Sequence, residues 1–256
     1  MTLSSLTAAN PGKPSFKASV AHGKDLADAL RISGFWHGKG KVNRQLWSFF
    51  NEAQFATFAR YWEHLLLDTH MRDGGTYRFR RYSQLHYDNE SHALTLLAHE
   101  AYEQPAYINS LNGGFKRHFE PIEETFLEHP FFMGLIHWLG AAYTKASEHA
   151  AWNIKLHPYR IIAGEAEGEP SPEGLHRDGV DFICSMLVRR SNVTGGETKI
   201  TDNNRKTLAT FTMNDPCDIM IGADARVMHG VSAVARKDPR KPTAYRDVLV
   251  IAFTKR

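Results

Sequence analysis

The second half of the sequence is a succession of short apolar segments divided by turn signals, and this pattern limits the possible folds more than any other feature. Turn motifs such as Gly195-Gly196 and Asn214-Asp215-Pro216 separate these segments. Many short strands divided by turns are typical of a β-sandwich or barrel. The predicted strands cover residues 152–162, 181–188, 197–201, 208–213, 218–221, 226–231 and 245–254. Within the first of them, Pro158 predicts an edge strand or a bulge.

Two segments in the first half have the apolar spacing of amphipathic helices. The first begins at Asn51, whose side chain can cap a helix, and Gln54 three residues later completes a capping box. The second begins at Pro130, because proline suits the first turn of a helix. Their apolar stripes are Phe55, Phe58, Trp62, Leu65 and Leu66 in the first helix, and Phe132, Leu135, Ile136, Leu139 and Tyr143 in the second. The stripes predict a layer of helices packed on the outer face of the later sheet.

The rest of the first half has shorter and less regular signals. We predict a helix over residues 24–33, closed by Gly34. We also predict a strand over 76–82 with a hairpin partner within 86–99, and a turn at 109–114.

The sequence contains no internal repeat and no linker, which predicts one domain over residues 1–256. Its expected parts are a flexible arm at 1–20, a helical cover with the first strands at 21–150, and a core barrel at 151–256 that carries the candidate site residues described below.

The charge of the chain excludes some classes of partner. Its 31 basic and 28 acidic side chains give a net charge of +3, and the basic residues are spread along the chain. We therefore expect no nucleic acid and no membrane surface as partners. The sequence begins without a signal peptide, and the two cysteines, Cys184 and Cys217, form no pair motif. These features predict a cytoplasmic protein with reduced thiols, and they leave the oligomeric state open.

A His-x-Asp triplet at His176 and Asp178 is the first candidate for chemistry. On an extended strand, side chains two residues apart point to the same face, so this imidazole and this carboxylate can hold one edge of a divalent metal ion. A third ligand on a facing strand would complete a 2-His-1-carboxylate triad, which leaves positions open for small molecules. The full triplet His176-Arg177-Asp178 also resembles a kinase catalytic loop. A kinase would have Asn five residues after the Asp, where this chain has Ile183, so the kinase hypothesis fails.

His229 and Arg246 are the residues that would complete such a site. His229 lies near the end of a predicted strand, far enough along the chain for the barrel to return to the His-x-Asp stretch. Arg246 lies in an otherwise apolar strand, where it would share a face with Val248 and Val250. A buried guanidinium is costly without an anion, and a 2-oxoacid with a second carboxylate would supply one. The expected metal is Fe(II), with the 2-oxoacid and O₂ on the open positions.

These residues resemble a family of bacterial Fe(II)/2-oxoglutarate dioxygenases that hydroxylate free L-amino acids, typified by L-isoleucine dioxygenase and including the biofilm-stress-motility proteins. The resemblance runs from about Thr76 to the C-terminus. It implies a mostly β core of the double-stranded β-helix (jelly-roll, cupin-like) type, with Fe(II) on His176, Asp178 and His229, and 2-oxoglutarate anchored by Arg246. The matching stretches are Tyr77-Arg78-Phe79-Arg80-Arg81-Tyr82, Leu111-Asn112-Gly113-Gly114, Phe119-Glu120-Pro121-Ile122, Pro172–Phe182, Gly195-Gly196-Glu197 and Tyr245–Val250.

The substrate side of the site is the less determined part. Tyr159 and Arg160 are candidates for contact with a substrate carboxylate, although the family tends to have His-Gln where this chain has His157-Pro158. The segment 165–174 is acidic and rich in Gly and Pro, and it predicts a lid-like loop before His176. Glu173 is more typical of a loop acid that faces water.

Our main hypothesis is hydroxylation of a free L-amino acid, with release of succinate and CO₂. The alternatives are an iron oxygenase of another substrate class and a cupin-like metal- and ligand-binding sensor without turnover.

Overall fold

An antiparallel sheet of nine strands forms the centre of the computed structural model, which describes residues 26–108, 111 and 113–256. The predicted arm at 1–20 and half of the turn predicted at 109–114 (residues 109, 110 and 112) lie outside the described residues. The order along the sheet is β1-β11-β7-β14-β6-β3-β2, and β4 pairs with β6 and β5. The strands are β1 (Phe35–Gly38), β2 (Leu66–Leu67), β3 (Arg78–Arg80), β4 (Ser83–Asp88), β5 (Ala93–Leu96), β6 (Ala151–Ile162), β7 (Phe182–Ser191), β11 (Ile219–Ala223) and β14 (Tyr245–Lys255).

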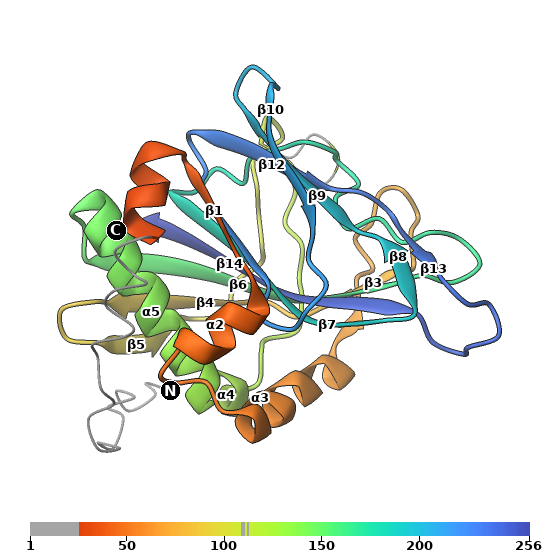
Figure 1. The fold of residues 1–256 in the computed structure, drawn as a ribbon, viewed down its shortest axis with the longest axis horizontal. Coiled ribbons are helices and arrows are strands. Elements are labelled where there is room, and N and C mark those ends of the chain that lie inside the picture. The colour runs from red at the N-terminus through yellow and green to blue at the C-terminus, as the bar shows by residue number, and fades with distance from the viewer. Residues whose placement is uncertain (1–25, 109–110, 112) are drawn as a thin grey trace.

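A smaller sheet faces this main sheet, and a cavity lies between the two. It has the order β10-β9-β12, and a two-stranded ladder of β13 and β8 extends beside it (Figure 1). These strands are β8 (Val193–Gly195), β9 (Glu197–Asp202), β10 (Thr207–Thr212), β12 (Val227–Val231) and β13 (Val234–Arg236). The two sheets form the predicted double-stranded β-helix.

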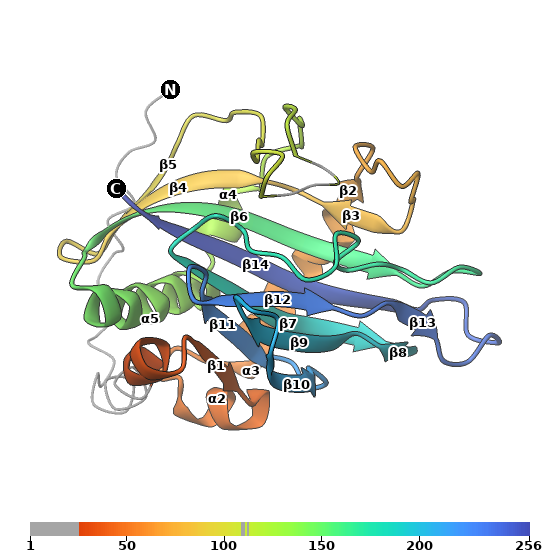
Figure 2. The ribbon, with the colours of Figure 1, turned by 90° about the horizontal axis from the view of Figure 1, so that it is seen from above.

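The helices cover the face of the main sheet that points away from the smaller sheet, as Figures 1 and 2 show together. They are the helical residues 26–32, α2 (Gly40–Leu46), α3 (Glu52–Ala59) followed by the 3₁₀ helix η1 (Arg60–His64), α4 (Glu124–Leu127) and α5 (Pro130–Ser147). As predicted, Asn51 caps α3 by accepting from the Gln54 amide (3.0 Å), and Pro130 begins α5. No helix among the described residues is long and apolar enough to cross a membrane.

Alternation along the central strands divides the interior into two regions. In β7, Cys184, Met186 and Val188 belong to the core under the helices, whereas Ile183 and Ser185 line the cavity between the sheets. In β14, Leu249, Ile251 and Phe253 take the helix side. Because successive side chains point to opposite faces, Arg246, Val248 and Val250 take the cavity side, as the sequence predicted.

Several predicted elements in the first half were wrong in detail. Residues 86–99 are not the partner of the strand at 76–82: β4 and β5 form their own hairpin, and β3 pairs with β6. The first helix stripe ends before Leu66, which lies in β2 and is 48% exposed. No helix or strand was predicted within residues 36–47, but this stretch contains the end of β1 and the whole of α2.

Pro158 is neither in an edge strand nor at a bulge, because β6 pairs with β14 along its whole length. On its other side, β3 pairs as far as Tyr159 and β4 begins to pair at Leu156. Pro158 therefore lies at the gap between β3 and β4, where an N–H donor is not needed.

Candidate metal centre and cosubstrate cavity

The predicted triad converges beside β12, an edge strand of the smaller sheet. His176 and His229 face each other across an antiparallel bridge, with reciprocal backbone N–H to O=C bonds of 2.9 and 3.0 Å. One ligand atom from each of His176, Asp178 and His229 lies within 4.8 Å of the other two. Asp178 Oδ2 is 3.4 Å from His229 Nε2. The loop segment that carries His176 and Asp178 thus runs beside β12, although it forms only this isolated bridge and not the extended strand that the spacing predicted.

Two local contacts orient the first two ligands. His176 Nδ1 lies 2.9 Å from the carbonyl oxygen of Gly174, so this nitrogen donates its proton and Nε2 keeps its lone pair for a metal. The loop at Asp178 is held by Asp224, whose carboxylate accepts from the amides of Asp178 (2.9 Å) and Gly179 (2.8 Å). Asp224 lies in the turn between β11 and β12 and is 2% exposed. It therefore links the Asp178 loop to the hairpin that carries His229.

The electrostatics of the triad suit a cation. Burial and the neighbouring His176 lower the pKa of His229 to about 3, so its imidazole is neutral with a free lone pair. Burial raises the pKa of Asp178, although His176 opposes the shift. Within the described residues, Asp178 Oδ2 and His229 Nδ1 are buried without a hydrogen-bond partner. Two imidazoles and one carboxylate that leave further positions open fit Fe(II).

Arg246 lies on the cavity face of β14 with its side chain 1% exposed. No described residue accepts a hydrogen bond from its Nε or Nη2, and burial and Arg190 lower its pKa to about 10. The guanidinium is still charged at neutral pH, so its burial calls for an anion. Gly196 (φ +70°) packs beside it, where a Cβ would lie 3.1 Å from Val234 Cγ1 and in ordinary contact with Arg246 Cδ (3.4 Å). The site thus fits a carboxylate group.

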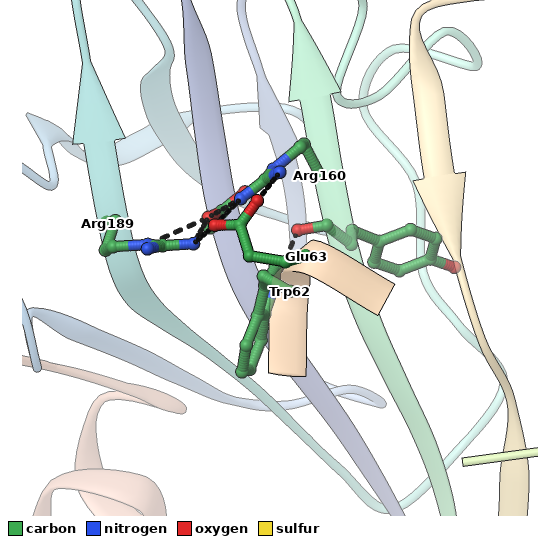
Figure 3. Close-up of polar contacts among 6 residues, drawn as sticks. Trp62, Glu63, Arg160 and Arg189 are labelled. Atoms are coloured by element: carbon green, nitrogen blue, oxygen red, sulfur yellow. Dashed lines mark hydrogen bonds and ion pairs between the residues drawn. The ribbon is translucent and has the colours of Figure 1, made fainter. Parts of the chain in front are cut away.

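The two residues predicted to contact the substrate, Tyr159 and Arg160, lie on opposite faces of the main sheet. Tyr159 lines the cavity, whereas Arg160, the next residue of β6, points to the opposite face. There Arg160 binds Asp247 (Nε to Oδ1, 2.7 Å) and Glu63 (Nη1 to Oε2, 2.9 Å). Figure 3 shows Glu63 held between Arg160 and Arg189. The prediction that Arg160 contacts the substrate is therefore wrong: its guanidinium joins η1 to the main sheet.

Sequence reasoning missed most of the polar residues on the substrate side of the cavity. These are Arg78, Arg80, Tyr102, Gln104 and Arg117, together with Glu173, which was expected to face water. The side chain of Glu173 is only 13% exposed and lies 3.5 Å from His176 Nε2. The alternation of Arg78 and Arg80 in one strand was a usable signal for the first two, because residues two apart share a face. Arg117 lies in an irregular segment that gives no such signal.

A family model described as 2OG-Fe dioxygenase matches residues 59–252. The chain belongs to this family. It is therefore a non-haem Fe(II)/2-oxoglutarate-dependent dioxygenase, which uses Fe(II), 2-oxoglutarate and O₂. When bound, Fe(II) and 2-oxoglutarate together activate O₂ for oxidation of a substrate. No sequence among the curated proteins matches this dioxygenase significantly.

Solved structures agree with the family. A bsmA homologue from Methylobium petroleophilum PM1 is 32% identical, with a TM-score of 0.84, over 91% of this chain and 93% of that one. Two more distant proteins share the fold of this dioxygenase. IDO from Bacillus thuringiensis is 19% identical (TM-score 0.74; 91% and 96% of the two chains). The Fe(II)/α-ketoglutarate-dependent dioxygenase TqaL is 17% identical (TM-score 0.76; 95% and 90%).

Proposed function

We propose that the enzyme hydroxylates a free L-amino acid, with Fe(II) held by His176, Asp178 and His229. Arg246 binds the distal carboxylate of 2-oxoglutarate through its unpartnered guanidinium edge. The amino acid occupies the rest of the same cavity, where Tyr159 remains a candidate contact.

The observation that carries the substrate class is the presence of both signs of charge on the cavity wall. Glu173 lies beside the triad, and arginines line the side formed by β3 and the segment before α4. A free amino acid brings an ammonium and a carboxylate, and each would meet a group of opposite charge. The apolar side chains of Ile183, Val248 and Val250 exclude water from the space between them.

Family membership leaves no support for the alternative of a sensor without turnover. An oxygenase of another substrate class is an outcome of the following experiment. The purified protein is supplied with Fe(II), 2-oxoglutarate and each of the proteinogenic L-amino acids, and succinate and product mass are measured.

The expected result is succinate formation that depends on one amino acid or a few, with a product heavier by one oxygen atom. Asp178→Ala should abolish both. Arg246→Met should raise the KM for 2-oxoglutarate by at least about 30-fold, because a buried charged pair is lost. Arg240→Met, which removes the same charge from an 88% exposed side chain, serves as the control. Succinate formation that no amino acid stimulates would refute the proposed substrate class.

A further inference from the structure

We propose that the substrate is an acidic L-amino acid, whose two carboxylates bind Arg80 and Arg117 and whose ammonium binds Glu173. The inference rests on the proposed function and names the substrate class within it. It follows from the charges that line the cavity, counted after each internal ion pair has been assigned.

One carboxylate serves two of the arginines. Asp68 is buried and lies 2.7 Å from Arg78 Nη2 but 3.8 Å from Arg80 Nη1, so the closer pair is with Arg78. The remaining close contact of the Arg80 guanidinium is with His157 Nδ1. This imidazole is fully buried, and burial together with Arg80 lowers its pKa well below the ordinary value, so it is neutral. Arg80 thus shares the single negative charge of Asp68 with Arg78, and the described residues balance its positive charge only in part.

Arg117 is a second incompletely compensated cation. Its Nη2 donates to the amide oxygen of Gln104 (3.1 Å), which is a neutral acceptor. No acidic side chain among the described residues forms an ion pair with it. Arg80 and Arg117 are each only 2% exposed, and the Nε of each is buried without a hydrogen-bond partner in the described part of the chain.

Aromatic rings hold both guanidinium groups without neutralising them. The guanidinium of Arg80 lies 3.8 Å from the centroid of the Phe119 ring, and that of Arg117 lies 4.7 Å from the centroid of Tyr102. Such contacts offset part of the desolvation cost of a cation, but a buried charge still requires a counter-ion to recover the rest. Two carboxylates would supply the two counter-ions and accept in bidentate geometry.

The remaining charge has the opposite sign. Glu173 lies on the cavity wall, and no Lys or Arg in the described structure pairs with it. Since Asp178 is assigned to the metal and Arg246 to 2-oxoglutarate, two cations and one anion are left for the substrate. An acidic amino acid at neutral pH carries two carboxylates and one ammonium, which complements this set. An apolar amino acid would leave one guanidinium buried and unpaired.

Isosteric substrates test the inference without any mutation. Turnover of L-aspartate is compared with that of L-asparagine, and L-glutamate with L-glutamine, by succinate formation and product mass. We expect kcat/KM to favour the acid of at least one pair by about 30-fold or more, because the amide cannot compensate a buried guanidinium. Faster turnover of a neutral amino acid than of both acids would overturn the inference and leave the proposed function standing. Turnover of no amino acid would overturn both.

Variants then assign the carboxylates to the arginines. Arg117→Met should raise the KM for the acidic substrate by about 30-fold or more and reduce the preference for acid over amide. The KM for 2-oxoglutarate should not change, and Arg240→Met should change neither. Arg117→Lys keeps the charge, so it should keep the preference for acid and protects the test against misfolding of the Met variant. A rise confined to the KM for 2-oxoglutarate would place Arg117 in the cosubstrate site and overturn the assignment.

Discussion

Asp224→Asn should weaken metal binding although Asp224 is not a ligand. The carboxylate accepts from three successive amides, those of Asp178 (2.9 Å), Gly179 (2.8 Å) and Val180 (3.3 Å). A hydrogen bond to a charged group contributes about 1.5–3 kcal/mol, and the longest of the three counts for little. Asparagine keeps one acceptor oxygen and turns an NH₂ group toward an amide donor. Burial raises the pKa of Asp224, so part of the gain from its charge is already offset. The expected loss is therefore about 2 kcal/mol.

The lost hydrogen-bond energy would weaken the hold on the Asp178 loop, and with it the orientation of Asp178 relative to His229. It corresponds to a roughly 30-fold increase in the metal Kd, within the range of about 10- to 100-fold found when groups that orient metal ligands are removed. Titration of the metal-free protein with Co(II), followed by calorimetry and visible absorption, measures it directly.

Asp202→Asn is the matched control. Asp202 accepts from the amides of Asn204 and Lys206 at 2.9 Å in the β9–β10 turn, and not from the amides of the Asp178 loop. It should lower the Tm without changing the Kd. If Asp224→Asn lowered the Tm but bound Co(II) as tightly as the wild type, Asp224 would only fasten the hairpin, and our reasoning would be refuted.

Three further results are expected. Gly196→Ala should raise the KM for 2-oxoglutarate several-fold, because its Cβ would lie 3.1 Å from Val234 Cγ1 and strain the positive-φ segment that packs against Arg246; Gly74→Ala has a similar positive φ with open space around it and should affect only the Tm. Glu63→Gln should destabilise the fold by about 1 kcal/mol at pH 6, a modest figure because the Glu63 side chain is 52% exposed. Hydrogen bonds from Arg160 and Arg189 lower the pKa of Glu63 from 4.5 to about 2, so this difference should vanish between those pH values as the pH falls; a difference that persists at pH 2 in urea titrations would contradict it. Leu139→Ala, at a fully buried position of α5, should cost about 2–5 kcal/mol in the same titrations without altering metal affinity, and a loss below 1 kcal/mol would show that the helix layer is not packed as described.

The parts of the fold that local periodicity encodes were predictable. The alternation in β14 placed Arg246, Val248 and Val250 on one face, and the stripe from Phe132 to Tyr143 predicted α5. The pairing of His176 and Asp178 with His229 was also expected, but its local basis differs: His176 and Asp178 lie in a loop with one isolated bridge, and His229 is at the centre of β12. The single-domain organisation and the lid-like role of 165–174 stay predictions, and the oligomeric state stays open.

By itself, the sequence determined the strand-rich core and the helical layer, and it identified His176, Asp178 and His229 as candidate ligands. The core and the helical layer depend on spacing along one segment, which fixes the face on which a side chain lies. Only the tertiary structure decided what each face meets. Arg160 pairs with Glu63, 97 residues away, and so lies outside the site. Arg117, which comes from an irregular segment, lines the cavity. Periodicity carries no information about such partners, because charge pairing across the fold depends on distances that no local pattern contains.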